Sequence, residues 1–595
     1  MTDYDALEEE LSQSKLTRET LARLWRFMSK YKKTFLTAIT LEGFWVMTVA
    51  YVPPKLIQKG IDDCILANNF KLLLILTGVY FLNLILKWIL NVNVLKLTWK
   101  AAQLTLQDIR VAVFEHIQNL SMKYFDRTKK GKIIARADRD VESLEHIAGW
   151  GPLVIFSSFA TMLLTVIIMI SYNWKLTAIV STVSPIIIIS SRIFQKKAMK
   201  AYRLLRRRLS RITANVAENV SGIQVVKAFC RERLNLKRFD DLSMDFTNVA
   251  IRASLVWFVY FPILGFMYAV ATVIILIFGG KMIHAGTLTI GELGAFILLL
   301  RYFFGPIEWL GHIYNESLHG AAAAERIFDL LDTKPEVVDK ENAVDMTVKN
   351  GNVEFSKVSF SYNPGKDDGD VLHSINFNVE SGQKLAVVGK TGAGKTSIVN
   401  LLIKFYEPQN GKILIDSYNV ADVTTKSLRS NMAVVPQDNF LFTGTVMENL
   451  TYIEKKVEPQ QVIEAAKKLG SHEVIMKLSD GYETQVKERG AGLSLGERQL
   501  ICFTRALLSD PEILILDEAT SAVDSYTENK LQHALIELTE GRTSIIIAHR
   551  LSTIKKADKI LVVDNGKIVE TGKHKELISN GGVYSNLYKE YLKTG

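Results

Sequence analysis

The stretch LAVVGKTGAGKTSIVNLLIKF, residues 385–405, decides the fold of the C-terminal half of the chain. An apolar strand, a glycine-rich loop and a helical run follow one another, which is the context that a phosphate-binding loop requires. The glycines let backbone N–H groups close round phosphate oxygens, and the helix N-terminus adds a favourable dipole. Lys395 would balance the charge of the β- and γ-phosphates, and Thr396 would offer a hydroxyl to Mg²⁺. The alternative is a chance glycine loop, which this context disfavours.

Further polar groups follow two later apolar strands. The run 513–516 ends in Asp517 and Glu518, and the run 545–548 ends in His549. Asp517 would hold Mg²⁺, directly or through water, and Glu518 would orient or deprotonate an attacking water molecule. The two carboxylates could instead cap the next helix. Ligands of parallel sheets bind at the carboxyl ends of strands, so these residues are expected to meet at one edge.

Short β-rich runs alternate with helical patterns from residue 351 onward, and this alternation indicates an α/β domain with a mainly parallel sheet. A polar stretch, residues 333–350, precedes it and is predicted to be a linker.

The N-terminal half is much more apolar. Hydrophobic residues make up 48% of the 595 residues and charged residues 23%, which is high in apolar content for a purely soluble protein. Residues 147–174 and 253–280 contain no Asp, Glu, Lys, Arg or His, and each exceeds the roughly 20 residues that a membrane helix needs. The predicted spans are residues 35–54, 72–95, 147–174, 176–191, 253–280 and 293–310.

Basic residues predict the orientation of these spans. Lys and Arg concentrate in the connections 96–146 and 192–252, which places both connections, and with them both termini, in the cytoplasm. The net charge of +10 therefore needs no nucleic-acid partner. Both connections keep a helical spacing. A helical hairpin of about 50 residues would reach roughly 35 Å beyond the bilayer, at 1.5 Å per residue.

Four ionisable residues fall inside predicted spans: Glu42, Lys87, Arg301 and Glu308. Such side chains are costly in a bilayer and usually face a cavity or a partner, which makes them candidate cavity residues. An interhelical ion pair or a side chain that snorkels to the interface is the alternative.

The ordered motifs of the C-terminal half resemble the nucleotide-binding domain of ATP-binding cassette (ABC) transporters. In this resemblance, 355–362 is similar to the A-loop, with Tyr362 stacked on adenine, and Gln437 is similar to the Q-loop residue that senses Mg²⁺ and contacts the membrane part. Residues 487–490 resemble the X-loop of exporters, Asp524 the D-loop residue, and His549 the switch histidine that touches the γ-phosphate.

The resemblance implies ATP and Mg²⁺ as ligands and assigns the following roles. The catalytic residues would be Glu518, His549 and Gln437; the ATP-binding residues Tyr362, Gly389, Thr391, Gly392, Ala393, Gly394, Lys395, Thr396, Ser397, Ser494, Gly496 and Asp524; and the metal ligands Thr396, Gln437 and Asp517.

The signature motif departs from the family pattern. The family has Leu-Ser-Gly-Gly-Gln, whereas residues 493–497 read LSLGE, with Leu495 and Glu497 replacing Gly and Gln. Ser494 and Gly496, which would meet the γ-phosphate across a dimer interface, are kept. One interpretation is neutral drift at a variable position. The other is a heterodimer in which one of the two ATP sites is impaired.

The resemblance extends into the membrane half. Residues 124–128 with Gly131 resemble the first intracellular loop of multidrug and lipid-flippase exporters, 218–229 the second, and 324–328 the stretch that joins the last span to the linker. Short coupling helices near 130–138 and 220–226 would then sit on the ATPase domains.

The fold class expected from these observations is a multidomain membrane protein, with a six-helix α transmembrane domain (1–332), a linker (333–350) and an α/β P-loop ATPase domain (351–595). The expected function is ATP-driven export or flipping of a hydrophobic or amphipathic substrate across the cytoplasmic membrane, by alternating access. The partners would be the lipid bilayer and a second half-transporter chain, with a homodimer favoured and a heterodimer open.

Three rival functions differ in what they require of the chain. An ATP-gated channel or regulator stays as the alternative. A soluble ATPase is disfavoured by the length of the apolar stretch 147–174, and an importer because its membrane and ATPase parts normally lie on separate chains. The identity of the substrate is not encoded in any motif that we recognise.

Overall fold

The structure is a computed structural model that describes residues 17–364, 369–453, 456–517, 525–548 and 550–594. It consists of two compact units. The first comprises Met1–Asn119 and Lys130–Thr333, and the second comprises Leu120–Lys129 and Lys334–Gly595. The chain therefore passes between the units three times, and a ten-residue excursion of the N-terminal half belongs to the C-terminal unit.

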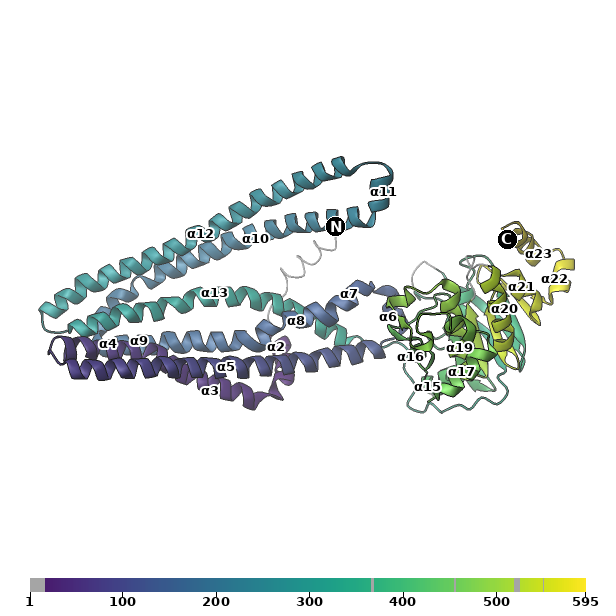
Figure 1. The fold of residues 1–595 in the computed structure, drawn as a ribbon, viewed down its shortest axis with the longest axis horizontal. Helices are drawn as coiled ribbons and strands as arrows, with labels where there is room; N and C mark the ends of the chain where they lie inside the picture. Colours follow the sequence, from purple (N-terminus) through teal and green to yellow (C-terminus); the bar gives the residue numbers. More distant parts are fainter. Residues whose placement is uncertain (1–16, 365–368, 454–455, 518–524, 549, 595) are drawn as a thin grey trace. The chain divides into compact units, whose positions relative to one another are not determined.

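The first unit is built from helices in the part that the structure describes (Figure 1). Its long helices are α3 (Lys32–Ala50), α5 (Phe70–Asn119), α9 (Gly151–Ser181), α10 (Ser184–Ser221), α12 (Glu232–His284) and α13 (Ile290–Asp332). Its short helices are α2 (Arg18–Ser29), α4 (Val52–Lys59), η1 (Gly60–Ile65), α7 (Lys130–Ala135), η2 (Arg136–Asp140), α8 (Val141–Ser143), η3 (His146–Trp150) and α11 (Ile223–Ala228). Helices α10 and α12 pack along each other, and α11 joins their far ends.

Within the described residues, four helical stretches are long and apolar enough to cross a membrane by length and composition: Lys32–Ile65, Phe70–Asn119, Lys130–Ser181 and Glu232–His284. They contain the predicted spans 35–54, 72–95, 147–174 and 253–280. The predicted span 176–191 runs from the end of α9 into α10, and 293–310 lies in α13. The number of six spans therefore stays a prediction.

The boundary between the predicted spans 147–174 and 176–191 has a clear local geometry. Helix α9 is interrupted at Asn173, whose φ of −160° and ψ of 109° are extended rather than helical. The Asn173 side-chain oxygen accepts a hydrogen bond from the N–H of Leu176 at 3.1 Å. This bond caps the helical segment that follows, because the first N–H groups of a helix have no partner within it.

Glu42 lies inside the helix bundle. Its side chain is 6% exposed on α3, which packs against α5 and α9. Asn83 of α5 is also buried and donates to the carbonyl of Thr48 at 3.1 Å, which places a polar contact between α3 and α5. Lys87 places its ammonium 5.8 Å from the ring centre of Trp45, and Arg301 is exposed. The side chain of Glu308 lies outside the described part.

Asp62 ties η1 to the start of α13. Its carboxylate accepts hydrogen bonds from the hydroxyl of Thr289 at 2.5 Å and from the N–H of Gly291 at 2.8 Å. Gly291 fits closely, because a Cβ there would stand 2.3 Å from the carbonyl oxygen of Gln58. Thr289 and Glu292 complete a capping box at the same helix end.

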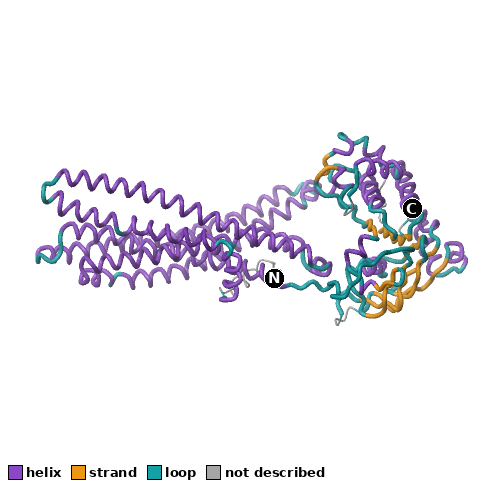
Figure 2. The backbone as a smooth tube through the Cα atoms, turned by 90° about the horizontal axis from the view of Figure 1, so that it is seen from below, coloured by secondary structure: helices purple, strands orange, loops and turns teal. Residues whose placement is uncertain are grey.

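The second unit is an α/β structure (Figure 2). Its strands are β1 (Val353–Phe360), β2 (Leu372–Val379), β3 (Lys384–Val388), β4 (Asn410–Ile415), β5 (Tyr418–Asn419), β6 (Met432–Val435), β7 (Gly444–Thr445), β8 (Gln485–Val486), β9 (Ile513–Asp517), β10 (Thr543–Ile547), β11 (Lys559–Asp564) and β12 (Lys567–Gly572). The main sheet has the order β12-β11-β3-β10-β9-β6; an antiparallel sheet has the order β2-β1-β4-β5, and β7 pairs with β8.

Helices surround the strands of the second unit. They are α6 (Met122–Arg127), α14 (Lys395–Leu402), η4 (Val420–Asp422), α15 (Thr425–Ser430), α16 (Val446–Leu450), α17 (Pro459–Lys468), α18 (His472–Ile475), η5 (Gly481–Glu483), η6 (Glu488–Gly490), α19 (Leu495–Leu508), α20 (Ser525–Thr539), α21 (Leu551–Lys556), α22 (His574–Ser579) and α23 (Val583–Thr594). Every residue of β10 is buried, which is typical of a central parallel strand covered on both faces. The expected α/β class of this half is confirmed.

Asp62→Ala should lower the free energy of unfolding of the first unit by about 1–2 kcal/mol, because the N–H of Gly291 and the hydroxyl of Thr289 lose their acceptor. Thermal unfolding of the purified chain in lipid nanodiscs measures the change. Asp63→Ala, which removes the neighbouring exposed carboxylate, is the control. An unchanged melting temperature for Asp62→Ala would contradict this role.

Candidate active site

Four parallel strands bring the predicted site residues to one edge of the main sheet. Strand β3 pairs with β10, β10 with β9, and β9 with β6, all in parallel register. Their carboxyl ends therefore lie at the same edge. The phosphate loop follows β3, Asp517 is the last residue of β9, and Gln437 comes two residues after β6. Ala548 follows β10.

The phosphate loop depends on glycine at specific positions. Gly394, the N-cap of α14, has a φ of +102°, in the region that favours glycine. A Cβ at Gly394 would stand 2.7 Å from the Cδ2 of Leu372, and one at Gly389 would stand 2.2 Å from the carbonyl oxygen of Val563. The loop backbone is therefore pressed against β2 and β11, and side chains at these positions would force it to move.

Lys395 is held at the centre of this loop. Its ammonium donates to the carbonyl oxygens of Gly389 at 2.8 Å and Lys390 at 2.9 Å, and the residue is 7% exposed. Burial lowers the pKa of Lys395, while the charge of Asp517 acts in the opposite direction. Lys395 and Asp517 therefore interact electrostatically at this edge of the sheet.

The oxygen ligands at this edge suit Mg²⁺. Thr396 is exposed at the start of α14, Asp517 is half-buried at the end of β9, and Gln437 is exposed. Among the described residues there is no group of three or more His, Cys, Asp or Glu that could hold a metal by itself. Mg²⁺ is commonly held by one or two carboxylates or hydroxyls together with substrate phosphates, so a hydroxyl, one carboxylate and an amide fit this mode.

Tyr362, the predicted adenine-stacking residue, lies two residues beyond β1 and against α14. Its hydroxyl is 3.0 Å from the Oγ of Ser397 and accepts from Asn400 at 3.4 Å. Its ring packs edge-on against Tyr406, with ring centres 5.0 Å apart, and against Phe360. Tyr362 is therefore placed by the helix that carries Lys395 and Ser397.

Helix α6, the excursion from the N-terminal half, contacts the residues around Tyr362. The hydroxyl of Tyr406 donates to Asp126, and Arg127 donates to the carbonyl of Tyr362 at 3.3 Å and to the side chain of Asn363 at 2.5 Å. Burial and the hydrogen bond to Asp126 raise the pKa of Tyr406, so its hydroxyl stays protonated and donating. The first coupling helix near 130–138 stays a prediction; the segment of the N-terminal half that belongs to the second unit contains α6, at 122–127.

The altered signature motif, residues 493–497, forms a regular N-terminus of helix α19. Ser494 is the N-cap of α19; its Oγ accepts from the N–H of Glu497 at 3.3 Å, and its own N–H donates to the Glu497 carboxylate at 2.7 Å. This reciprocal pair is a capping box, which a glutamate or a glutamine can form. Glu497 therefore has a local structural role that the sequence comparison alone did not reveal.

The other predicted residues of the phosphate loop differ in exposure. Ala393, Gly394, Lys395 and Ser397 are buried in the loop and in α14, whereas Thr391, Gly392 and Thr396 are exposed. Glu518, Asp524 and His549 lie outside the described residues, so their roles stay predictions. Sequence reasoning assigned Asp126 and Arg127 to the first intracellular loop without predicting their contacts around Tyr362, and it missed Tyr406. Their contacts join segments more than 200 residues apart, and no local pattern reveals such contacts.

A groove with a volume of about 1050 Å³ opens elsewhere on the second unit, between α15, β6 and α19. Its lining combines apolar and basic side chains, among them Arg429, Met432, Phe440, Phe442 and Arg505. Phe440 and Phe442 are exposed large apolar residues.

Two family models and several known proteins are similar to this chain. Residues 34–307 match the model of the ABC transporter transmembrane region, and 372–521 match the ABC transporter model. The chain is 36% identical over 583 residues to an uncharacterized ABC transporter ATP-binding protein, YknV, of Bacillus subtilis (96% of this chain, 95% of that protein). It is 33% identical over 574 residues to the putative multidrug export ATP-binding/permease protein YgaD of the same organism (96% and 98%).

A solved structure is also similar over nearly the whole length. It is the structure of a bacterial Atm1-family ABC exporter with ATP bound, which is 27% identical to this chain. The TM-score is 0.75, and the match covers 94% of this chain and 98% of that one.

Tyr406→Phe should raise the ATP concentration at half-maximal hydrolysis by about 2- to 10-fold. The substitution removes the hydrogen bond from Tyr406 to Asp126, and this loss should destabilise the bound position of Tyr362, which packs on Tyr406, by about 1 kcal/mol. The maximal rate should change little, since Tyr406 is remote from the reacting phosphate. Steady-state hydrolysis at varied ATP concentration separates the two effects.

Tyr418→Phe, at an exposed tyrosine on β5, is the matched control and should behave like the wild type. If Tyr406→Phe lowered only the maximal rate, Tyr406 would not act through the adenine-binding residue.

Proposed function

The chain belongs to the ABC transporter family as a half-transporter of the exporter type, and from this premise we propose that two copies work together in the cytoplasmic membrane to move a hydrophobic or amphipathic substrate outward. The observation that carries the proposal is that a unit with membrane-length apolar helices and a complete phosphate loop lie on one polypeptide. Importers of this family normally divide these parts between chains, and nothing specific favours a gated channel.

The residues at the sheet edge fit ATP hydrolysis. Lys395 would bind the β- and γ-phosphates, and Thr396, Asp517 and Gln437 would hold Mg²⁺, which neutralises phosphate charge when bound. Glu518, directly after Asp517, would accept a proton from the attacking water, and His549 would contact the γ-phosphate. Tyr362 would fix the adenine ring, so that the phosphates are held in register with Lys395.

The need for a second copy follows from two surfaces. The tip of the α10–α12 hairpin is exposed and apolar: Val220, Val225 and Phe229 are 66, 62 and 71% exposed. The groove between α15, β6 and α19 is open and exposes Phe440 and Phe442. Apolar surfaces of this kind mark interaction sites. We assign the tip of one copy to the groove of the other, and the Ser494 region of one copy to the ATP bound by the other.

The transport cycle would be alternating access. ATP bound between the two ATPase domains would bring these domains together. The α6 segment and the α10–α12 hairpin would transmit this movement to the membrane helices, and hydrolysis would return the pump to its starting conformation. A hydrophobic or amphipathic substrate suits the apolar helix bundle, in which Glu42 and Asn83 are two of the buried polar side chains. Both termini would be cytoplasmic.

Glu518→Gln should keep ATP binding and lower hydrolysis about 100-fold or more, because the general base is lost while Lys395 and the loop remain. Lys395→Ala should instead weaken ATP binding itself. Equilibrium binding of a fluorescent ATP analogue and phosphate release, measured on both variants, test the two roles. Wild-type turnover by Glu518→Gln would contradict the catalytic assignment.

Transport itself is tested in inverted membrane vesicles that contain the chain. ATP should drive accumulation of the amphipathic dye Hoechst 33342 above its external concentration, and Glu518→Gln vesicles should show none. ATP-dependent passage that never exceeds equilibrium would favour a gated channel over a pump.

A further inference from the structure

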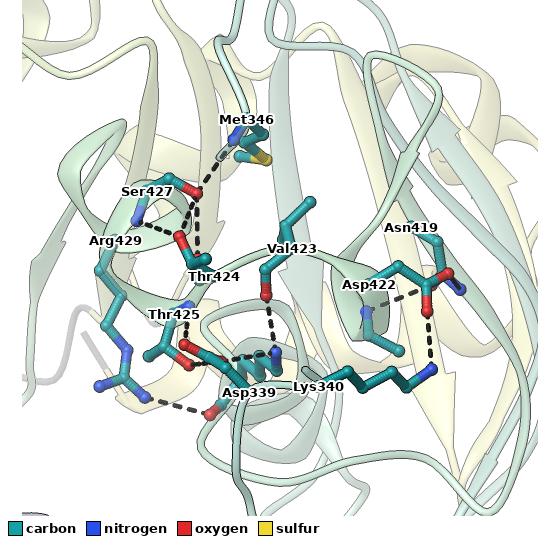
Figure 3. Close-up of polar contacts among 12 residues, drawn as sticks. Asp339, Lys340, Met346, Asn419, Asp422, Val423, Thr424, Thr425, Ser427 and Arg429 are labelled. Carbon is teal, nitrogen blue, oxygen red and sulfur yellow. Dashed lines mark hydrogen bonds and ion pairs between the residues drawn. The ribbon is translucent and has the colours of Figure 1, made fainter. Parts of the chain in front are cut away.

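The segment between the two halves, residues 334–350, is fastened along the second unit, and we call it the strap (Figure 3). Val344 pairs with Val423 in a β-bridge, and the N–H of Met346 donates to the Oγ of Ser427 at 3.0 Å. Lys340 forms an exposed ion pair with Asp422 at 2.6 Å. The sequence had predicted a linker here. The structure gives the strap fixed partners some 80 residues later in the chain.

Asp339 is the most heavily bonded residue of the strap. Its carboxylate accepts from the N–H of Thr425 at 2.8 Å, from the hydroxyl of Thr425 at 2.5 Å and from the ammonium of Lys404 at 3.0 Å. Burial by itself would raise the pKa of Asp339, but these hydrogen bonds outweigh it and hold the pKa below its ordinary value. The carboxylate is therefore charged and shared between two elements of the second unit.

Lys404, one of these partners, terminates the helix of the phosphate loop. It adopts a φ of +55° just after the C-cap of α14, with the N–H of Phe405 bonded to the carbonyl of Asn400 at 2.9 Å, as in a Schellman motif. The residue is 1% exposed, and its ammonium bonds only within the protein, to Asp339 and to the carbonyl of Val423 at 2.8 Å. A buried ammonium requires such partners, so the Asp339 carboxylate is its counter-charge.

Arg429 joins the same helix end to the groove. It lies on α15 and lines the groove, and it donates to the carbonyls of Ile403 at 3.1 Å and Lys404 at 3.1 Å. Its guanidinium also lies 5.0 Å from the ring centre of Phe405. Thr425, the other partner of Asp339, is the first residue of α15 and also lines the groove.

We propose that Asp339 is a positioning residue that clamps the groove wall α15 to the end of the phosphate-loop helix α14, so that ATP binding at one end of α14 orders the groove at the other. Helix α14 begins at Lys395 and ends beside Lys404, so a rigid element of eight residues separates nucleotide from clamp. The proposal rests on the proposed function for the identity of the ligand, ATP, and adds a route by which the nucleotide controls the surface assigned to a second copy.

Hydrogen exchange of the full chain in lipid nanodiscs, with and without the ATP analogue AMP-PNP and Mg²⁺, tests the clamp. In the wild type, the analogue should slow exchange both in the phosphate loop, 389–397, and in α15, 425–430. Asp339→Asn combined with Lys404→Met removes the buried ammonium together with its carboxylate partner, so that no unpaired buried charge remains and the ionic link is lost. This variant should keep protection of the loop and lose protection of α15.

Two further variants sharpen the test. Lys340→Gln breaks the exposed ion pair of the same strap and should leave both protections unchanged, which controls for any change in the strap. Arg429→Gln, at an exposed position on α15, removes the two bonds to the end of α14 together with the contact to the Phe405 ring, and should also uncouple α15 from the loop.

Protection of α15 that persists in both the double variant and Arg429→Gln would overturn the proposal, as would a wild type in which only the loop is protected. A wild type without protection of the loop would contradict the ATP site itself, and the clamp with it. Failure of the clamp and failure of the proposed function therefore give different results.

Discussion

The backbone path of the phosphate loop is the constraint on which the rest of the second unit depends. A Cβ at Gly389 would collide with β11, and a Cβ at Gly394 would collide with β2. The loop that contains both glycines closes round the ammonium of Lys395. The buried parallel strand β3 precedes the loop and helix α14 follows it. Together they hold the backbone N–H groups at the sheet edge where Asp517 and Gln437 also lie. The site exists because the topology brings these strand ends together.

Residues around the phosphate loop are held in place by contacts with helix α14. Lys395 begins it, Tyr362 rests on Ser397 and Asn400 along its side, and Lys404 closes its end. Two segments that directly adjoin the crossings between the units contact this helix or the residues that pack on it. The α6 excursion reaches Tyr362 through Arg127, and the strap reaches Lys404 through Asp339. One short helix therefore connects the nucleotide site to the segments that continue into the membrane unit.

The sequence predicted the parts of this arrangement that depend on local pattern. The phosphate loop, the apolar strands and the membrane-length helices follow from residue type and spacing, and the α/β class of the second half was confirmed. The strap and α6 could not be predicted in the same way. Polar residues such as Asp339 and Lys340 predict a linker when read locally, and only their partners Thr425 and Asp422, far along the chain, show that they are bonded. The meaning of Glu497 likewise required the geometry of its capping box.

The most direct test of the central claim, an ATP-driven pump made of two copies of this chain, is the particle mass and the ATPase rate of the chain purified alone in lipid nanodiscs. The account predicts a particle with two chains and robust Mg²⁺-dependent hydrolysis, which would also show that the LSLGE signature is competent. A monomeric particle, or a two-copy particle without turnover, would contradict the account and indicate that a different chain supplies the missing half.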